Sequence, residues 1–126
     1  AAIGFVHGDP FNANASIADD GQITWYDFDL CGPGWAAMDL AGAYGCTHLP
    51  DVPAGEQDRR WQAFLAGYRT VRPIAPVELA AVPALLAANR LFGCGFHLTK
   101  APIQGLGAVD GPYFDRYIVA IRQALR

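Results

Sequence analysis

Three groups of polar residues near the start of the chain have the types and spacing that phosphoryl transfer requires. They are His7-Gly8-Asp9 with Asn14 five positions after the aspartate, then Asp27-Phe28-Asp29, then Asp39-Leu40-Ala41. Phosphoryl transfer uses a carboxylate beside the attacking hydroxyl and oxygen ligands for Mg²⁺, because the protein mainly positions groups and neutralises phosphate charge. The order and spacing of the three groups therefore indicate one shared site.

An aspartate followed by an asparagine after four intervening residues can supply both functions from one loop. Pro10 and its neighbours let the loop curl, so that the Asp9 carboxylate faces an acceptor hydroxyl while the Asn14 amide oxygen faces a metal ion. Asp27 follows a predicted strand and can give a second, charged ligand. We expect the oxygens of Asn14 and Asp27 to converge on one divalent cation.

Short strands must position these residues. Residues 3–6 are apolar and predict a short buried strand that leads into the first group. Residues 15–18 and 22–26 predict a hairpin, because the Asp20-Gly21 pair between them favours a tight turn. The next loop begins at Asp27, and Gly and Pro exclude residues 31–34 from a helix interior.

Helices are expected beyond this point. Residues 36–46 are rich in alanine and predict a helix that ends at a loop over residues 47–55. The next predicted helix carries four large side chains on one face, at i, i+3, i+4 and i+7: Trp61, Phe64, Leu65 and Tyr68. Pro73 and Pro76 then break the chain.

The rest of the chain also predicts helices. Residues 77–98 form an apolar helical region in which Pro83 predicts a restart or a kink. Residues 105–111 predict a loop, and Asp110 can cap a last helix. The apolar stripe of that helix consists of Phe114, Tyr117, Ile118, Ile121 and Leu125. Strands followed by helices indicate an α+β, mostly helical fold: short catalytic-loop hairpins, then a helical bundle.

Composition limits the possible functions. No Lys or Arg precedes Arg59, and the acidic front half argues against nucleic-acid binding, which needs clustered cations. No run of about 20 apolar residues is evident that could span a bilayer, so we expect a soluble protein without a membrane partner. The cysteines, Cys31, Cys46 and Cys94, are odd in number and widely spaced, which favours reduced thiols in a cytoplasm.

The motifs resemble the catalytic lobe of the aminoglycoside phosphotransferase, choline kinase and homoserine kinase superfamily, whose fold is that of the protein kinases. In these families the first motif is H-G-D-x-x-x-x-N, matched from His7 to Asn14, and the second is D-x-D or D-x-E, matched from Asp27 to Asp29. They also tend to carry a D-L-A helix start, matched at Asp39. The resemblance covers essentially the whole chain, although its specific motifs lie in the first 41 residues.

The resemblance implies a role for each matched residue. Asp9 would be the catalytic base, and Asn14 and Asp27 the Mg²⁺ ligands. His7 and Asp39 would brace the catalytic loop. A role for Asp29 stays open, because it could assist a metal, bind substrate or face solvent. His7 could equally be a core histidine, and Asp39 could simply cap its helix.

The same resemblance implies parts that this sequence lacks. The family has an N-terminal lobe with a glycine-bearing phosphate loop and a lysine that holds ATP, and the only lysine here is Lys100. We therefore expect residues 1–126 to be a single catalytic lobe, a fragment that packs against a missing N-terminal lobe. Most nucleotide-binding residues would lie upstream, and the isolated piece would be inactive. Its oligomeric state is not predicted.

Several interpretations compete. The expected activity is ATP-dependent transfer of the γ-phosphate to a small-molecule hydroxyl, as in an aminoglycoside, choline, ethanolamine or homoserine-like acceptor. The alternative is a pseudokinase or binding domain of the same fold, and a magnesium-dependent nuclease or phosphatase is a further one. Aromatic residues that could cage a cationic substrate, or form the core, are Trp25, Trp35, Trp61 and Tyr68. Arginines that could hold a substrate carboxylate, or lie exposed on helices, are Arg69, Arg72 and Arg90.

Overall fold

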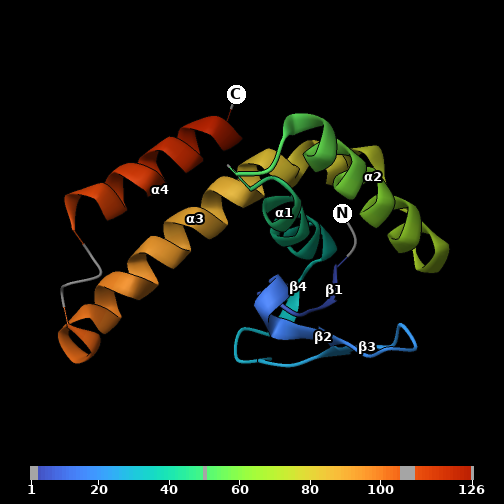
Figure 1. Ribbon diagram of the computed structural model, residues 1–126, viewed down its shortest axis with the longest axis horizontal. Coiled ribbons are helices and arrows are strands. Elements are labelled where there is room, and N and C mark those ends of the chain that lie inside the picture. The colour runs from blue at the N-terminus through green and yellow to red at the C-terminus, as the bar shows by residue number, and fades with distance from the viewer. Residues whose placement is uncertain (1–2, 50, 106–109, 126) are drawn as a thin grey trace. The chain divides into compact units, whose positions relative to one another are not determined.

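The computed structural model describes residues 3–49, 51–105 and 110–125 (Figure 1). The chain divides into two compact units, residues 1–82 and residues 83–126. Short antiparallel strands come first and longer helices follow, so the α+β, mostly helical class predicted from the sequence is confirmed at this level. The expectation of a single lobe stays a prediction.

Four short strands are present in the described part of the first unit, in two antiparallel pairs. β1 (Ile3–Val6) pairs with β4 (Gly32–Trp35), and β2 (Ala15–Ile17) pairs with β3 (Ile23–Trp25). The predicted hairpin between β2 and β3 is confirmed. Its turn places Gly21 at φ 84°, a backbone conformation that favours glycine, and the Asp20 side chain accepts a hydrogen bond from the Gln22 N–H at 2.9 Å.

β1 is a strand as predicted, but the expectation that it is buried is wrong for most of its length. Only Val6 is buried, whereas Ile3 is 73% exposed and Phe5 is 75% exposed. The two-stranded sheet packs one face against α1, where Val6 lies, and its other face is uncovered within this unit. Trp35, the register partner of Ile3, is exposed as well.

The sequence excluded residues 31–34 from a helix interior, which is confirmed, but it gave no sign that they form a strand. Gly and Pro are depleted in strands, and Pro33 is tolerated here in a two-stranded sheet whose strands are both edges. Gly34 is needed for packing, because a Cβ atom there would lie 2.9 Å from Val6 Cγ2. The pairing of β1 with β4 thus depends on glycine at position 34, which has no side chain to strike Val6.

Helix α1 (Ala36–Thr47) forms the centre of the first unit, as predicted from its alanine content. Leu40 and Ala41 are fully buried. α1 contacts β1, β4 and α2, and its small residues, which include Ala37, Ala41 and Ala43, allow these elements to approach closely.

Helix α2 (Ala54–Val71) confirms the predicted aromatic face. Leu65 is buried, the Trp61 and Phe64 rings stack with centroids 5.6 Å apart, and Tyr44 of α1 meets Trp61 edge-on at 5.1 Å. Offset and edge-to-face pairs are the favoured aromatic geometries. These contacts join α2 to α1.

An ion pair closes the turn between α2 and α3 (Pro76–Gln104). The chain break predicted at Pro73 and Pro76 is confirmed, because α2 ends at Val71 and α3 begins at Pro76. The Glu78 side chain is buried. It accepts one hydrogen bond from the Arg72 guanidinium at 2.5 Å and a second from the Ala75 N–H at 2.9 Å. These two donors, the Ala75 N–H first, lower the pKa of Glu78 below its usual value. Arg72 also donates to the Tyr68 hydroxyl at 3.2 Å.

Pro83 does not restart the helix, because α3 runs through both Pro83 and Pro102, and the alternative, a kink at Pro83, stays a prediction. A proline inside a helix removes one hydrogen bond, but the surrounding Ala and Leu residues favour helix strongly enough for it to continue. Residues 76–103 are also long and apolar enough, by length and composition, to cross a membrane, and 17% of the most apolar window is buried. The expectation that no segment meets this criterion is therefore wrong. A core helix of a soluble protein can have the same composition.

Helix α4 (Gly111–Ala124) begins where predicted, and the capping role of Asp110 is confirmed by a 2.8 Å hydrogen bond from the Tyr113 N–H. The predicted loop over residues 105–111 lies partly outside the described residues, at 106–109. The predicted stripe is rotated: Tyr113 is the buried residue of α4, while Ile118 and Leu125 are exposed. The Tyr113 ring contacts His97 of α3, with centroids 5.8 Å apart.

Candidate functional site

The loop that leaves β1 turns back on itself and brings Asp9 and Asn14 together. A short 3-10 helix, η1 (Asn12–Asn14), ends the loop. The Asn14 Nδ2 group donates to the Asp9 backbone oxygen and to the Asp9 carboxylate oxygen Oδ2, both at 3.0 Å. Asp9 is exposed and Asn14 is buried, so the Asp9 carboxylate is accessible to solvent while the buried Asn14 amide holds it by a hydrogen bond.

These bonds fix the orientation of the Asn14 amide. Its nitrogen is directed at Asp9, so its oxygen Oδ1 points elsewhere, and no hydrogen bond to this oxygen is present among the residues that the structure describes. A neutral amide oxygen with unused lone pairs is a suitable ligand for a hard cation.

Asp27 is joined to the same loop through the backbone. The Tyr26 N–H donates to the Asn14 carbonyl oxygen at 3.0 Å, which extends the β2–β3 pairing by one step and places Asp27 directly after that contact. Asp27 itself has φ 62°, and among the described residues it is the one non-glycine residue with positive φ. Such strain is found where a particular side-chain direction is needed.

The carboxylate of Asp39 in α1 holds the first half of the loop. Its two oxygens accept hydrogen bonds from the His7 N–H at 2.8 Å and the Gly8 N–H at 3.0 Å. Both bonds join residues about thirty positions apart. A charged acceptor makes such bonds stronger than neutral ones, so the first turn of α1 fixes the backbone that precedes Asp9.

His7 connects the loop to the residues around Asp27. Its ring lies 4.5 Å from the Phe28 ring and 5.4 Å from the Trp25 ring, centroid to centroid. Its Nε2 atom lies 3.2 Å from the Tyr26 carbonyl oxygen, and its Nδ1 atom accepts from the Asp9 N–H at 3.4 Å. This pattern assigns the neutral tautomer with the proton on Nε2.

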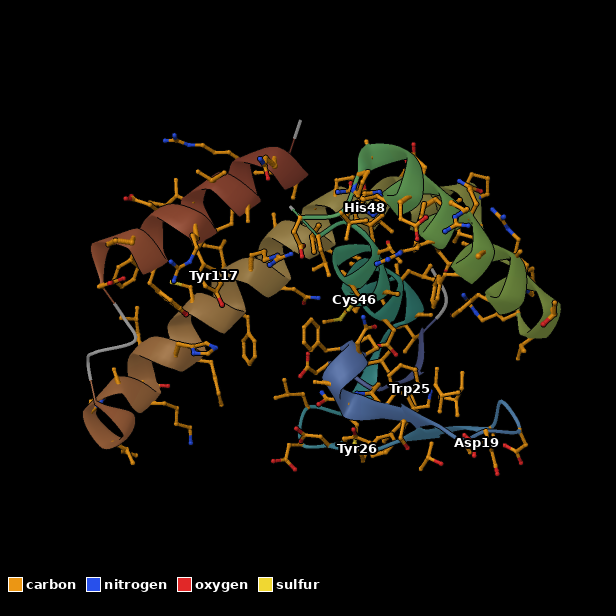
Figure 2. All side chains as sticks on the ribbon, in the orientation of Figure 1. Asp19, Trp25, Tyr26, Cys46, His48 and Tyr117 are labelled. Atoms are coloured by element: carbon orange, nitrogen blue, oxygen red, sulfur yellow. The ribbon has the colours of Figure 1, made fainter. Side chains whose placement is uncertain are left out.

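Figure 2 shows Asp19 at the turn of the β2–β3 hairpin, and Trp25 and Tyr26 lie where strand β3 ends. Trp25 is 43% exposed and Trp35 is 53% exposed, so the interpretation of these two residues as core is wrong in this chain. Trp61 and Tyr68 are half-buried and pack against other rings in α2. The two pairs of aromatics therefore have different environments.

The remaining candidates make no hydrogen bond or ion pair with Asp9, Asn14 or Asp27 in the described part of the chain. Asp29 is exposed and makes no hydrogen bond or ion pair with the described residues. Arg72 is engaged by Glu78, which leaves it a structural role in place of binding a substrate carboxylate. Arg69 is exposed, and Arg90 is half-buried.

Three residues had no predicted role in positioning the site: Gly8, Gly42 and Cys46. Gly8 has φ 85°, and a Cβ atom there would lie 2.2 Å from the Leu30 carbonyl oxygen. Gly42 and Cys46 of α1 contact Pro10. The available signal was their spacing, because residues 39, 42 and 46 share one face of a helix.

The polar side chains of the site carry oxygen atoms, which are the donors that Mg²⁺ prefers. No group of three or more His, Cys, Asp or Glu side chains that could hold a metal occurs in the described ranges. The oxygens that these residues could offer to a cation are those of the Asn14 amide and of the Asp9 and Asp27 carboxylates, and their convergence on one ion stays a prediction. Hard, oxygen-rich and incompletely surrounded sites are typical of Mg²⁺ that also binds phosphate.

Comparison with known proteins agrees with this chemistry. Residues 1–74 match the model of the phosphotransferase enzyme family. An uncharacterised protein of Deinococcus radiodurans is 35% identical over 112 residues, covering 89% of this chain and 33% of that protein. An uncharacterised protein of Synechocystis is 27% identical over 116 residues, covering 92% of this chain and 31% of that protein.

The chain thus spans about a third of the length of the curated relatives it matches. No solved structure matches it. The family match includes the loop from His7 to Asn14, both strand pairs, α1 and α2. The chain belongs to the phosphotransferase enzyme family.

Proposed function

We propose that this chain carries the catalytic and magnesium-binding part of an ATP-dependent enzyme that moves the γ-phosphate to a small-molecule hydroxyl, within a kinase-like lobe. One observation carries the proposal: the Asn14 amide nitrogen donates to Asp9, and its oxygen accepts no hydrogen bond from the described residues, which leaves that oxygen free to bind a cation. Family membership supports the reaction class, and this geometry supports the assignment of roles.

Each residue then has a defined task. The exposed Asp9 carboxylate orients the acceptor hydroxyl and accepts its proton through the oxygen that Asn14 leaves uncommitted. Asn14 Oδ1 and the Asp27 carboxylate would hold Mg²⁺, which when bound neutralises charge on the phosphates. His7 and Asp39 keep the backbone of the loop fixed, so that these atoms need little rearrangement during the reaction.

The rest of the active site would come from the remaining part of a longer protein. The relatives are about three times as long as this chain, and the outer face of the β1–β4 sheet is apolar and exposed through Ile3, Phe5 and Trp35. Such a face is typical of a surface that another part of the same protein covers. We propose that an N-terminal, nucleotide-holding lobe belongs to this protein and packs against this one.

The acceptor is proposed only as a class. Aminoglycosides, choline or ethanolamine, and homoserine-like alcohols all present a hydroxyl to a base such as Asp9. An enzyme acting on such metabolites would work in the cytoplasm. The acidic character of residues 1–58 suits a cationic acceptor, since those residues contain no Lys or Arg.

The test uses the full-length protein that contains this chain. Mg²⁺ with ATP should raise its melting temperature, and Asp27→Ala should abolish this increase, because it removes the charged ligand. Asp19→Ala is the matched control: it removes an exposed carboxylate at the hairpin turn and should leave the increase intact.

A panel of small alcohols, amino alcohols and aminoglycosides then tests catalysis by ADP release, with Asp9→Asn as the inactive reference. A melting shift with no turnover on any acceptor would favour the pseudokinase alternative. Phosphoester hydrolysis that needs Mg²⁺ but no nucleotide would favour a phosphatase or nuclease.

A further inference from the structure

The face of α1 that meets the catalytic loop is built from three residues at i, i+3 and i+7. Asp39 binds the loop backbone before Asp9, as described above. Gly42 lies against the Pro10 ring, and Cys46, labelled in Figure 2, donates from Sγ to the Pro10 carbonyl oxygen at 3.6 Å. α1 therefore contacts the loop on both sides of Asp9.

The contact at Gly42 is the tightest of these. A Cβ atom built there would lie 2.8 Å from Pro10 Cγ, 2.9 Å from Cδ and 4.0 Å from the Pro10 nitrogen. Carbon atoms that are not bonded to each other do not approach this closely. A flexible side chain could turn away, but the proline ring is closed on its own backbone nitrogen, so the ring and the backbone must move together.

That backbone nitrogen is bonded directly to the carbonyl carbon of Asp9. The Asp9 carbonyl oxygen is one of the two acceptors of the Asn14 amide, at 3.0 Å. A displacement of Pro10 away from α1 therefore changes the position of Asp9 and the bond that orients Asn14. Both consequences fall on the atoms assigned to the base and the metal ligand.

We infer that Gly42 is a positioning residue for phosphoryl transfer: by having no side chain, it sets the distance of Pro10 from α1 and so the placement of Asp9 and Asn14. This inference depends on the proposed function of those two residues. It predicts an effect on the chemical step, since a shift of about 1 Å at a reacting group can lower a rate by about 100-fold.

Gly67 provides a matched control within a second helix of the same unit. It lies in α2, and a Cβ atom there would meet nothing within 4 Å. Gly67→Ala adds the same methyl group to a helix and should raise the melting temperature slightly, because alanine favours helix more than glycine does. It should leave turnover unchanged.

The experiment compares Gly42→Ala and Gly67→Ala in the full-length protein, with ADP release measured at saturating acceptor and varied ATP. We expect Gly42→Ala to lower kcat by about 10- to 100-fold, with the KM for ATP changed by less than about threefold, because the loop moves while the upstream nucleotide site does not. Equal kcat values for Gly42→Ala and the parent would overturn the inference.

Pro10→Ala supplies a rescue that distinguishes positioning from general damage. It removes the Cγ and Cδ atoms that the new methyl group would strike, so Gly42→Ala should have little further effect on kcat in a Pro10→Ala background. The same comparison decides the matter if Gly42→Ala alone does not fold: a folded, active double variant supports the inference. A double variant that is no more active than Gly42→Ala contradicts it.

The result is separable from the proposed function. If the parent protein transfers phosphate to none of the acceptors and Mg²⁺ with ATP does not shift its melting temperature, the proposed function fails. If the parent is active and the Gly42 and Pro10 variants behave independently, only the positioning inference fails.

Discussion

Each of the two units is stabilised internally by a different kind of contact. In residues 1–82, hydrogen bonds join distant segments, as from His7 to Asp39 or from Tyr26 to Asn14. In the described part of residues 83–126, hydrogen bonds join residues no more than four apart, and contacts between α3 and α4 are made by rings such as those of His97 and Tyr113. Charge differs as well, because all but two of the twelve carboxylates lie in the first unit.

The difference is consistent with the proposed site, which lies in the first unit. Long-range hydrogen bonds and backbone positions with special φ values are needed to hold a few atoms in a reactive arrangement. Helix packing through apolar rings tolerates small shifts better, since the free energy gained by burying apolar surface does not depend on direction. Substitutions should therefore have large, geometry-dependent effects in the first unit and small, additive ones in the second.

The largest effect is expected for Gly8→Ala. The substitution combines a positive φ with a Cβ atom 2.2 Å from the Leu30 carbonyl oxygen, so we expect a loss of about 2–5 kcal/mol in the free energy of unfolding. Denaturation of the full-length protein with urea measures it. Gly21→Ala is the control, because Gly21 has φ 84° with nothing near its Cβ position and should cost only about 1 kcal/mol. Equal losses would show that the Leu30 contact is unimportant.

A smaller loss is expected for Glu78→Gln, about 1–3 kcal/mol, because a buried carboxylate loses its charge-assisted bonds to Arg72 and the Ala75 N–H. The folded pKa of Glu78 is lower than its ordinary value of 4.5. Its stabilising contribution is thus complete above that value and declines as pH falls toward the folded pKa. Melting temperatures at pH 7 and pH 3.5 should differ less in the variant than in the parent. An unchanged pH dependence would contradict this role.

In the second unit, Asp110→Ala should cost about 1 kcal/mol, since it removes the cap that accepts from the Tyr113 N–H. Asp115→Ala removes an exposed carboxylate from the same helix and serves as the control. Thermal denaturation of both variants gives the difference. A cost above about 3 kcal/mol would mean that α4 depends on Asp110 for more than capping.

The smallest effect is expected for Tyr113→Phe. The Tyr113 hydroxyl is buried and forms no hydrogen bond of normal geometry with the described residues, and its burial raises the pKa of the group. Removing it should leave the free energy of unfolding unchanged or raise it by up to about 1 kcal/mol. Tyr117→Phe, at a half-buried neighbour, is the comparison. A marked loss for Tyr113→Phe would show a polar interaction in this unit and weaken the contrast drawn above.

Local elements and candidate reactive groups could be predicted from the amino-acid sequence. The hairpin, the extent of α1, the aromatic face of α2 and the cap at Asp110 follow from turn, propensity and capping rules that act over a few residues. The motifs at Asp9, Asn14, Asp27 and Asp39 indicated the phosphotransferase family because their order along the chain is itself a signal.

Features that depend on contacts between distant segments became known from the folded structure alone. The pairing of β4 with β1, the exposure of Ile3 and Phe5 and the rotation of the α4 face each reflect which neighbour covers a surface. The contact of Gly42 with Pro10 has the same origin, because the distance between two residues 32 positions apart in the sequence is set by how the elements pack. No local pattern contains that information.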